Sequence, residues 1–519
     1  MKIIWKRMTA GAIAGVLLLA MSACAPKGET ENTTGDTGEL FAPGTEISMA
    51  VGSHSSWPYD ENWNMWRYFR EATGVKFNVQ AIPNEDINTK VTLMLASPDT
   101  LPDLIYLDSK LLSDDFAKQG ALVAIDDYME LMPNYTRFWN SLPEEERTAR
   151  LMIRKSTDGK TYFPQNYGTD SRQGIRAWMY RKDIFEKHGL AVPTTMDEVY
   201  ETAKKLKQLY PTSYPLCQRE GLRNIGVMGA LWKPYFTWEL YYDFENPSWH
   251  YGATEDTMLE IVKFMRKMYE EELLPPDYLH GTTRNWEELM STERGFMTAD
   301  FVVRIDHFNT ILRKDNPSYT LAAMTPPKPD TPTAGTKVNK FNVDQKGYVI
   351  CNTGKEDRIK KAIRLVDWMY TDEAAELLSW GKEGETFEVK NGARHFIRPE
   401  DGDIEGEYGV FSYGTYLRVD PTAAIDIASE EQQAGIRVAL DNTIENYNPA
   451  LWMALADDEQ REYNQINDSV KTYVEENLSK FLQAQRPLSE WDSYVSGAKA
   501  LGIDRMIEIY DTAYQRIAG

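Results

Sequence analysis

The chain has 519 residues, and its 79 Asp and Glu against 57 Lys and Arg give a formal net charge of −22. Such an acidic surface repels a phosphate backbone, so nucleic acid is a poor partner, and a strongly anionic ligand is disfavoured unless a local basic cleft overrides the average charge. The length exceeds what one hydrophobic core usually serves, so we expect two or more lobes.

The N-terminal residues have the pattern of a secretory leader. Three cations, the last of them Arg7, precede a short apolar stretch at 10–20, which Ser22-Ala23-Cys24 follows. The apolar run is shorter than the roughly 20 residues that span a bilayer, so we predict a signal peptide at 1–23 that is removed. Loss of the three leader cations would leave a net charge near −25. Residues 24–45 hold almost nothing to bury and are predicted to be a disordered tether.

From residue 46 the chain alternates between strand and helix patterns, with strands at 46–51, 76–82 and 104–107 and helices at 63–72 and 86–97. This alternation predicts βαβ units and a largely parallel sheet. Ligands of such sheets lie beyond the carboxyl ends of the strands. Trp57 and Asp108 follow the first and third strands, so both are candidate ligand-binding residues. A ring packed under its loop and a solvated loop charge are the competing interpretations.

A second block of elements follows residue 172. A strand is expected at 175–180, and Thr195 and Glu198 have the spacing of a capping box at the start of a helix. Methionines at helical spacing around Met265 are typical of core filler. Further strands are expected at 296–305, 319–324 and 347–351, with helices at 356–370 and 459–482. The two cysteines outside the leader, Cys217 and Cys351, lack the spacing of zinc or redox sites and are expected to be buried thiols.

The densest aromatic run contains Trp232, Tyr235, Phe236, Trp238, Tyr241 and Tyr242. Sugars expose flat C–H faces edged with hydroxyls, so a sugar site needs rings for the faces and charged or amide groups for the edges. Trp232, Tyr235 and Trp238 are the candidate rings. Asp300 could accept hydroxyl protons, and Arg172 and Arg219 could donate to sugar oxygens. Core packing of the rings and surface solvation of the charges remain open as alternatives.

Several stretches resemble counterparts in one known family. They are Pro102-Asp103-Leu104-Ile105-Tyr106, Asp158-Gly159-Lys160-Thr161-Tyr162-Phe163-Pro164, Met179-Tyr180-Arg181-Lys182-Asp183, Pro234-Tyr235-Phe236-Thr237-Trp238 and Trp380-Gly381-Lys382-Glu383-Gly384. In kind and order they are similar to the extracellular solute-binding proteins of ABC importers, in the lipoprotein branch of the carbohydrate-binding family that includes maltodextrin-binding protein. The Cys24 context resembles a lipobox, although Met21 replaces the usual leucine.

The resemblance implies a two-lobe α/β fold of the type II periplasmic-binding-protein class, hinged and with multiple crossovers. The first lobe would comprise 46–172 and 343–420, and the second 173–342 and 421–519. It also implies that Tyr235 stacks on a sugar ring, that Trp380 lies near the ligand and that Cys24 is lipidated. Some relatives carry a calcium loop where this chain has Tyr210-Pro211-Thr212-Ser213-Tyr214, so neither a metal nor a cofactor is expected.

These observations predict a monomeric extracellular lipoprotein that is anchored to the membrane, captures an oligosaccharide and delivers it to the permease subunits of an ABC importer. An enzyme is not expected, an expectation that rests on the family resemblance and the lipoprotein leader; the lack of HExxH among the six histidines and of G-x-S-x-G excludes only enzymes that carry such motifs. Paired carboxylates need no motif, however, so a glycoside-active enzyme stays open as an alternative. A lipoprotein that binds peptides or another solute is the second alternative.

Overall fold

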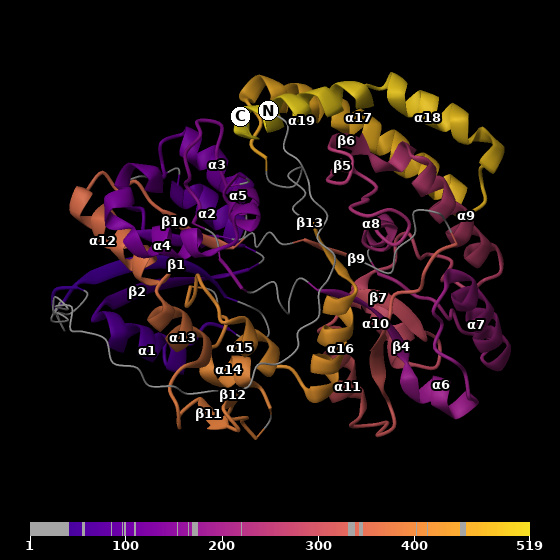
Figure 1. Ribbon diagram of the computed structural model, residues 1–519, viewed down its shortest axis with the longest axis horizontal. Coiled ribbons are helices and arrows are strands. Elements are labelled where there is room, and N and C mark those ends of the chain that lie inside the picture. Colours follow the sequence, from indigo (N-terminus) through magenta and orange to yellow (C-terminus); the bar gives the residue numbers. More distant parts are fainter. Residues whose placement is uncertain are drawn as a thin grey trace, which may run out of the picture. The chain divides into compact units, whose positions relative to one another are not determined.

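The structure, a computed structural model, describes residues 41–518 except for 54–57, 85, 96, 98–99, 108–109, 153, 165, 169–174, 220, 331–337, 342–345, 401, 413 and 447–452 (Figure 1). The predicted leader and Cys24 therefore lie outside the described residues. The folded part begins earlier than the predicted tether allows, because Phe41 is buried in a core cluster and the Thr45 carbonyl accepts from Lys76 N. Within the described ranges, no helix is both long enough and apolar enough to cross a bilayer.

The first lobe is built on a four-stranded sheet with the order β10-β3-β1-β2. Strand β1 (Glu46–Ser53) pairs in parallel with β2 (Lys76–Pro83) and β3 (Leu104–Leu107), and α1 (Asn64–Thr73) and α2 (Ile87–Leu95) make the crossovers. The predicted parallel sheet is confirmed for these strands. The edge strand β10 (Gly347–Ile350) returns much later in the chain and pairs antiparallel with β3.

Further elements complete the first lobe around this sheet. They are α3 (Lys110–Lys118), the 3-10 segment Ile125–Leu131, α4 (Pro133–Ser141), α5 (Glu144–Met152), α12 (Glu356–Trp368), α13 (Asp372–Trp380), β11 (Phe387–Lys390), β12 (Ala393–Phe396), α14 (Ile404–Tyr408) and α15 (Pro421–Asp426). Ala423 and Ile427 pack in a cluster with Met65 of α1, whereas Ala428 packs with strands of the second lobe. These contacts lie next to the predicted lobe boundary at 420, which stays a prediction.

The second lobe contains a three-stranded sheet with the order β7-β4-β8. Strand β4 (Arg176–Arg181) is antiparallel to both β7 (Met297–Phe301) and β8 (Leu321–Met324), in contrast to the parallel pairing of β1 with β2 and β3. The predicted strand at 296–305 ends at Phe301. Beyond it, Ile305 and Phe308 are buried at helical spacing, which starts α11 (Arg304–Leu312) instead.

Other helices and strands surround this sheet. They are α6 (Lys182–His188), α7 (Met196–Leu209), α8 (Leu222–Gly229), β5 (Leu240–Asp243), β6 (Ser248–Tyr251), the 3-10 segment Gly252–Thr254, α9 (Asp256–Glu270), α10 (Thr283–Ser291), α16 (Glu430–Asp441), α17 (Asp457–Leu482), the 3-10 segment Leu488–Glu490, α18 (Trp491–Ala500) and α19 (Ile503–Ala518). A large core cluster joins the aromatic run to α9, α17 and α19. Strand β9 (Val338–Phe341), which links β8 to β10 along the chain, pairs in parallel with β13 (Thr443–Asn446).

Several local predictions are confirmed. Thr195 caps α7 in a capping box with Glu198, and Met258, Met265 and Met268 of α9 are fully buried as core filler. Both cysteines are free and buried. Burial alone raises the pKa of the Cys217 thiol to about 12, so it stays protonated at neutral pH.

Candidate functional site

The candidate site lies at the edge of the second-lobe sheet where β4 begins and β7 ends. Arg176 pairs with Phe301 and Ala177 with Asp300 across the two antiparallel strands. The chain reaches this edge from the first lobe, since Tyr167 pairs with Arg418 and packs on a first-lobe core cluster, whereas Ile175 already belongs to a second-lobe core cluster. Side chains at this edge therefore lie next to the crossover.

The structure brings together Arg219 and Asp300, two residues singled out from the sequence. Asp300 is fully buried at the end of β7, and Arg219 holds both of its carboxylate oxygens, with Nη2 donating to Oδ1 at 2.9 Å and Nε donating to Oδ2. Such a two-point, charge-assisted contact fixes both groups in one geometry. Asp300 therefore acts as the holder of a guanidinium and not as a free acceptor for hydroxyls.

Two further arginines approach the same carboxylate. Arg176 Nη1 lies 3.7 Å and Arg304 Nε lies 3.9 Å from Asp300 Oδ1. Arg304 also contacts Glu287 of α10, with Nη1 3.3 Å from Oε1. Three guanidinium groups thus share one buried carboxylate. Sequence reasoning missed Arg176 and Arg304, because only the strand register places them beside Asp300.

Aromatic rings pack against the guanidinium groups of these arginines. The guanidinium of Arg176 lies 3.6 Å from the centroid of the Phe301 ring, and that of Arg304 lies 5.3 Å from the Trp286 ring. Trp286 is itself fixed, since its indole N–H donates to Thr298 Oγ1 at 3.0 Å. A cation over a ring face gains attraction and loses mobility. The rings therefore hold the arginine cluster, defined here as Arg176, Arg219 and Arg304, in place.

His307 on α11 borders the arginine cluster and contacts Glu287, with Nε2 3.2 Å from Oε1. Burial and then the charge of Arg304 lower the pKa of the imidazole below its ordinary value of 6.5, against the opposing effect of Glu287. His307 therefore adds no positive charge at neutral pH.

Tyr235 lies beyond α8, a helix that contacts both β7 and β9. Asn224 of α8 donates to the Ala299 carbonyl at 3.0 Å, which ties this helix to β7. Tyr235 has a φ of 63°, in the left-handed region that a non-glycine residue rarely adopts. Its half-buried ring lies 5.2 Å from that of Phe244. Strain of this kind persists where function requires it and the surroundings enforce it.

The surroundings of Tyr235 do enforce its backbone conformation. Phe236 is buried against Gly229 and Gly252 so closely that a Cβ at Gly229 would lie 2.3 Å from Cδ1 of the ring. Lys233 is held by the β5–β6 hairpin, with Nζ 2.7 Å from the Tyr241 hydroxyl and 3.2 Å from Glu255 Oε2. Burial tends to raise the pKa of Glu255, but the contacts with His250 and Lys233 bring it below its ordinary value. Lys233, Tyr241 and the ionised Glu255 therefore form one hydrogen-bonded cluster beneath the loop that carries Tyr235.

The remaining predicted site residues fall into two groups. Trp232, Trp238 and Trp380 are 4%, 7% and 1% exposed, and all three pack in core clusters. The indole of Trp380 donates to Asp420 Oδ2 at 2.8 Å and its ring stacks on Phe396. In this structure these three are core residues, with no ring face left open to a sugar. Trp57, Asp108 and Arg172 lie outside the described residues.

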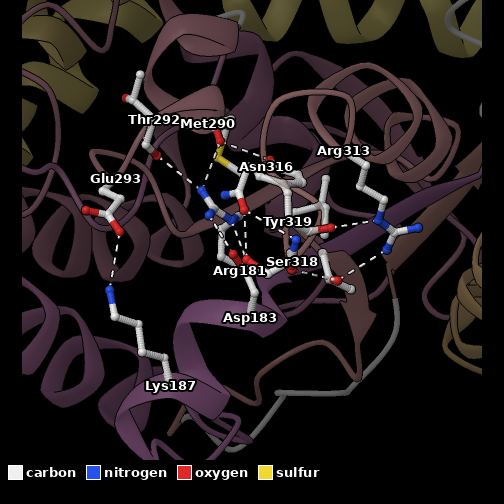
Figure 2. Close-up of polar contacts among 12 residues, drawn as sticks. Arg181, Asp183, Lys187, Met290, Thr292, Glu293, Arg313, Asn316, Ser318 and Tyr319 are labelled. Atoms are coloured by element: carbon white, nitrogen blue, oxygen red, sulfur yellow. Dashed lines mark hydrogen bonds and ion pairs between the residues drawn. The ribbon is translucent and has the colours of Figure 1, made fainter.

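A polar cavity of about 480 Å³ lies at the opposite end of β4. Figure 2 shows the polar contacts of three of its lining residues, Arg181, Asp183 and Lys187. Its buried Arg181 donates to both oxygens of Asp183, at 2.9 and 2.7 Å, and to the carbonyls of Met290 and Thr292. Lys187 contacts Glu293 at 3.4 Å. Each of these cations thus has its own acceptor. In the described part of the chain, no group of three His, Cys, Asp or Glu side chains is placed to hold a metal ion.

Comparison with known proteins identifies the class to which this fold and site belong. Over residues 60–376 the chain matches a family described as bacterial extracellular solute-binding protein. The chain resembles FusA of S. pneumoniae, an ABC-transporter substrate-binding protein solved in complex with kestose, with a TM-score of 0.68 and 17% identity over 91% of this chain and 99% of that one. At this identity the likeness shows the fold, which is the two-lobe solute-binding fold. The chain belongs to the bacterial extracellular solute-binding protein family.

Three curated relatives match the chain at 21–27% identity, two of them over 52% and 62% of it. A binding protein of Brucella abortus (strain 2308) is 27% identical over 52% of this chain and 57% of its own length. Lipoprotein LipO of Bacillus subtilis is 24% identical over 62% of this chain and 63% of its own length. The polygalacturonan/rhamnogalacturonan-binding protein YtcQ of Bacillus subtilis is 21% identical over 90% of this chain and 91% of its own length. The chain thus spans little more than half the length of the first of these relatives.

Proposed function

We propose that this chain captures an oligosaccharide outside the cell as a monomer and delivers it to the permease subunits of an ABC importer. In this proposal a lipid on Cys24 anchors it to the outer face of the membrane. The leader pattern before Cys24 and the similarity to LipO support the anchor. A saccharide ligand is supported by the complex of FusA with kestose and by the name of YtcQ, a polygalacturonan/rhamnogalacturonan-binding protein.

The observation that carries the proposal is the conformation of Tyr235. A half-buried tyrosine in the left-handed region, held there by Phe236 and Lys233, presents a rigid apolar face with a polar tip. A sugar ring offers the complementary surface, a C–H face edged with hydroxyls. In this proposal the arginine cluster beside β7, the strand to which α8 is tied, supplies donors for the edges.

Closure of the lobes around the ligand would convert binding into a signal that the importer reads. We place the first lobe at 41–168 and 343–427 and the second lobe in the rest of the folded chain. The paired strands β9 and β13 lie in the connecting stretches and are the natural hinge.

A glycoside-active enzyme is less well supported. Hydrolysis needs one carboxyl group to transfer a proton and a second to stabilise charge or activate water. Asp300 is bound by Arg219 through both carboxylate oxygens, so both oxygens are already engaged within the fold and are not free to exchange a proton with a ligand. The family comprises binding proteins.

The proposal is tested by calorimetry with a panel of neutral and acidic oligosaccharides, followed by chromatography of the recovered ligand. We expect binding to at least one saccharide and recovery of that saccharide unaltered. Tyr235→Ala should weaken binding, while Tyr128→Ala, which removes a half-buried tyrosine from the first lobe, should leave it unchanged. Failure to bind any saccharide, or recovery of a shortened one, would contradict the proposal.

A further inference from the structure

A small cavity of about 110 Å³ lies in the second lobe, where α17 and α19 meet the β5–β6 hairpin (Figure 1). Its lining includes three tyrosines, which are Tyr251 of β6, Tyr463 of α17 and Tyr510 of α19. Glu239, which directly precedes β5, adds a carboxylate. Segments far apart in the chain thus bring three phenol rings and an acidic group to one small space.

The three tyrosines are held in place by the core beneath them. Tyr251 and Tyr510 are 4% and 7% exposed and belong to the large core cluster of this lobe. The ring of Tyr510 lies 5.3 Å from that of Trp249 and 5.0 Å from that of the half-buried Tyr463. The rings are therefore fixed before a ligand arrives, so little conformational entropy is lost on binding.

The Glu239 carboxylate lies close enough to the three tyrosines to affect each of them. Burial raises the pKa of all three hydroxyls above the ordinary value of 10, and the negative charge of Glu239 acts in the same direction. The phenols therefore stay neutral at neutral pH. Lys471 also lines the cavity, but it contacts Glu475 one turn further along α17, with Nζ 3.9 Å from Oε1.

The size and the lining of the cavity limit the class of ligand. A cavity of about 150 Å³ holds one benzene molecule, so this smaller cavity of about 110 Å³ has room for a compact group and not for a disaccharide. Neutral aromatic rings attract a cation through their negative faces, and a nearby ionised carboxylate adds Coulomb attraction. Aromatic side chains around a compact space are the arrangement that recognises quaternary ammonium groups.

We propose that this cavity binds a small methylated ammonium compound of the choline type, a ligand distinct from the saccharide of the proposed function. Tyr251, Tyr463 and Tyr510 pack against the methyl groups, and Glu239 offsets the positive charge. A methylated ammonium fits better than a primary ammonium, which brings three N–H donors that each need an acceptor. The net charge of −22 attracts such a cation to the protein surface.

The test compares choline with dimethylbutanol, its neutral isostere, in which carbon replaces the nitrogen. Both are titrated calorimetrically at low ionic strength into the full mature protein and its variants. Tyr463→Leu removes a ring and Glu239→Gln removes a charge, whereas Tyr463→Phe keeps the ring. Tyr473→Leu is a matched control, because Tyr473 is a half-buried tyrosine of the same helix that stacks on Tyr494 instead. Thermal unfolding of each variant confirms that it is folded.

We expect choline to bind about tenfold or more tightly than dimethylbutanol, the effect of aromatic rings on a partly desolvated cation. Tyr463→Leu and Glu239→Gln should each remove most of that preference, whereas Tyr463→Phe and Tyr473→Leu should keep it. Equal binding of the two probes, binding of neither, or an undiminished preference in either Tyr463→Leu or Glu239→Gln would overturn the inference. The proposed function is tested separately by the oligosaccharide titrations and stands or falls with those.

Discussion

The two ends of strand β4 both bury an arginine near an aspartate, yet they use that pair differently. At the Arg181 end the guanidinium is matched by Asp183 and two backbone carbonyls, and Arg313 and Lys187 nearby each have a glutamate. At the Arg176 end three guanidinium groups converge on Asp300. We call the Arg181 end the balanced end, because its cations are paired within the fold, and we propose that the Arg176 end is a functional end that faces the ligand. In this proposal one strand joins a structural end to a functional one.

The largest effect on stability is expected at the balanced end. Arg181→Met would leave Asp183, whose side chain is 10% exposed, without its partner, and breaking a buried pair from one side costs about 3–5 kcal/mol. Urea unfolding measures this cost. The double variant Arg181→Met/Asp183→Leu should recover part of it. A cost below about 1 kcal/mol for the single variant would contradict the structural role of this network.

The variant Tyr235→Gly separates an effect on ligand binding from an effect on stability within the candidate site. Glycine adopts the left-handed region without strain, so the free energy of unfolding should rise by up to about 1 kcal/mol. The loss of the ring should weaken saccharide binding by about 1–2 kcal/mol, or roughly 5-fold to 30-fold. Urea unfolding and calorimetry on the same preparation give the two values. Unchanged affinity would remove Tyr235 from the site.

Arg304→Met tests whether the functional end contributes to stability. Its guanidinium contacts Asp300 and Glu287 only at 3.9 and 3.3 Å, and Asp300 keeps the two-point contact with Arg219. We therefore expect a loss of less than about 1 kcal/mol in unfolding free energy, several-fold smaller than for Arg181→Met. A loss as large as that of Arg181→Met would show that both ends are structural.

The smallest expected effect concerns pH at the balanced end. Hydrogen bonding from Arg313 lowers the pKa of Glu431 below its ordinary value of 4.5, with burial opposing. A carboxyl group with a lowered folded-state pKa stabilises the protein above its unfolded-state pKa, and that contribution disappears as the pH falls through the folded-state value. Glu431→Gln should therefore lower the urea midpoint slightly at neutral pH, and the gap should close as the pH falls below 4.5. A gap that persists in acid would contradict the assignment.

Predictions from sequence were accurate where the signal was local. The Thr195–Glu198 capping box and the parallel pairing of β1, β2 and β3 depend on residues close in the chain, and the structure has both. The end of β7 was predicted wrongly because Phe301 to Ile305 reads as apolar in either geometry. Whether Ile305 continues a strand or begins a turn of α11 is decided by the packing of Phe308, which lies further along.

The candidate site was only partly predictable, because its contacts are set by tertiary register. Arg219 and Asp300 were each singled out, but nothing in the sequence pairs residues so far apart. Arg304 lay inside a predicted strand and was missed. Aromatic richness drew attention to Tyr235, whose role in binding stays a prediction, and it could not distinguish this half-buried residue from the buried Trp232 and Trp238, because burial depends on what packs around a ring and not on the ring itself.

Hydrogen–deuterium exchange with and without a bound saccharide tests the contrast between the two ends of β4 most directly. Ligand should slow exchange at the start of α11 and in the loop around Tyr235, and should leave α6 and the loop at 313–320 unchanged. Protection of α6 and the 313–320 loop, with no change at Arg304 or Tyr235, would contradict the account and move the binding site to the cavity beside Arg181.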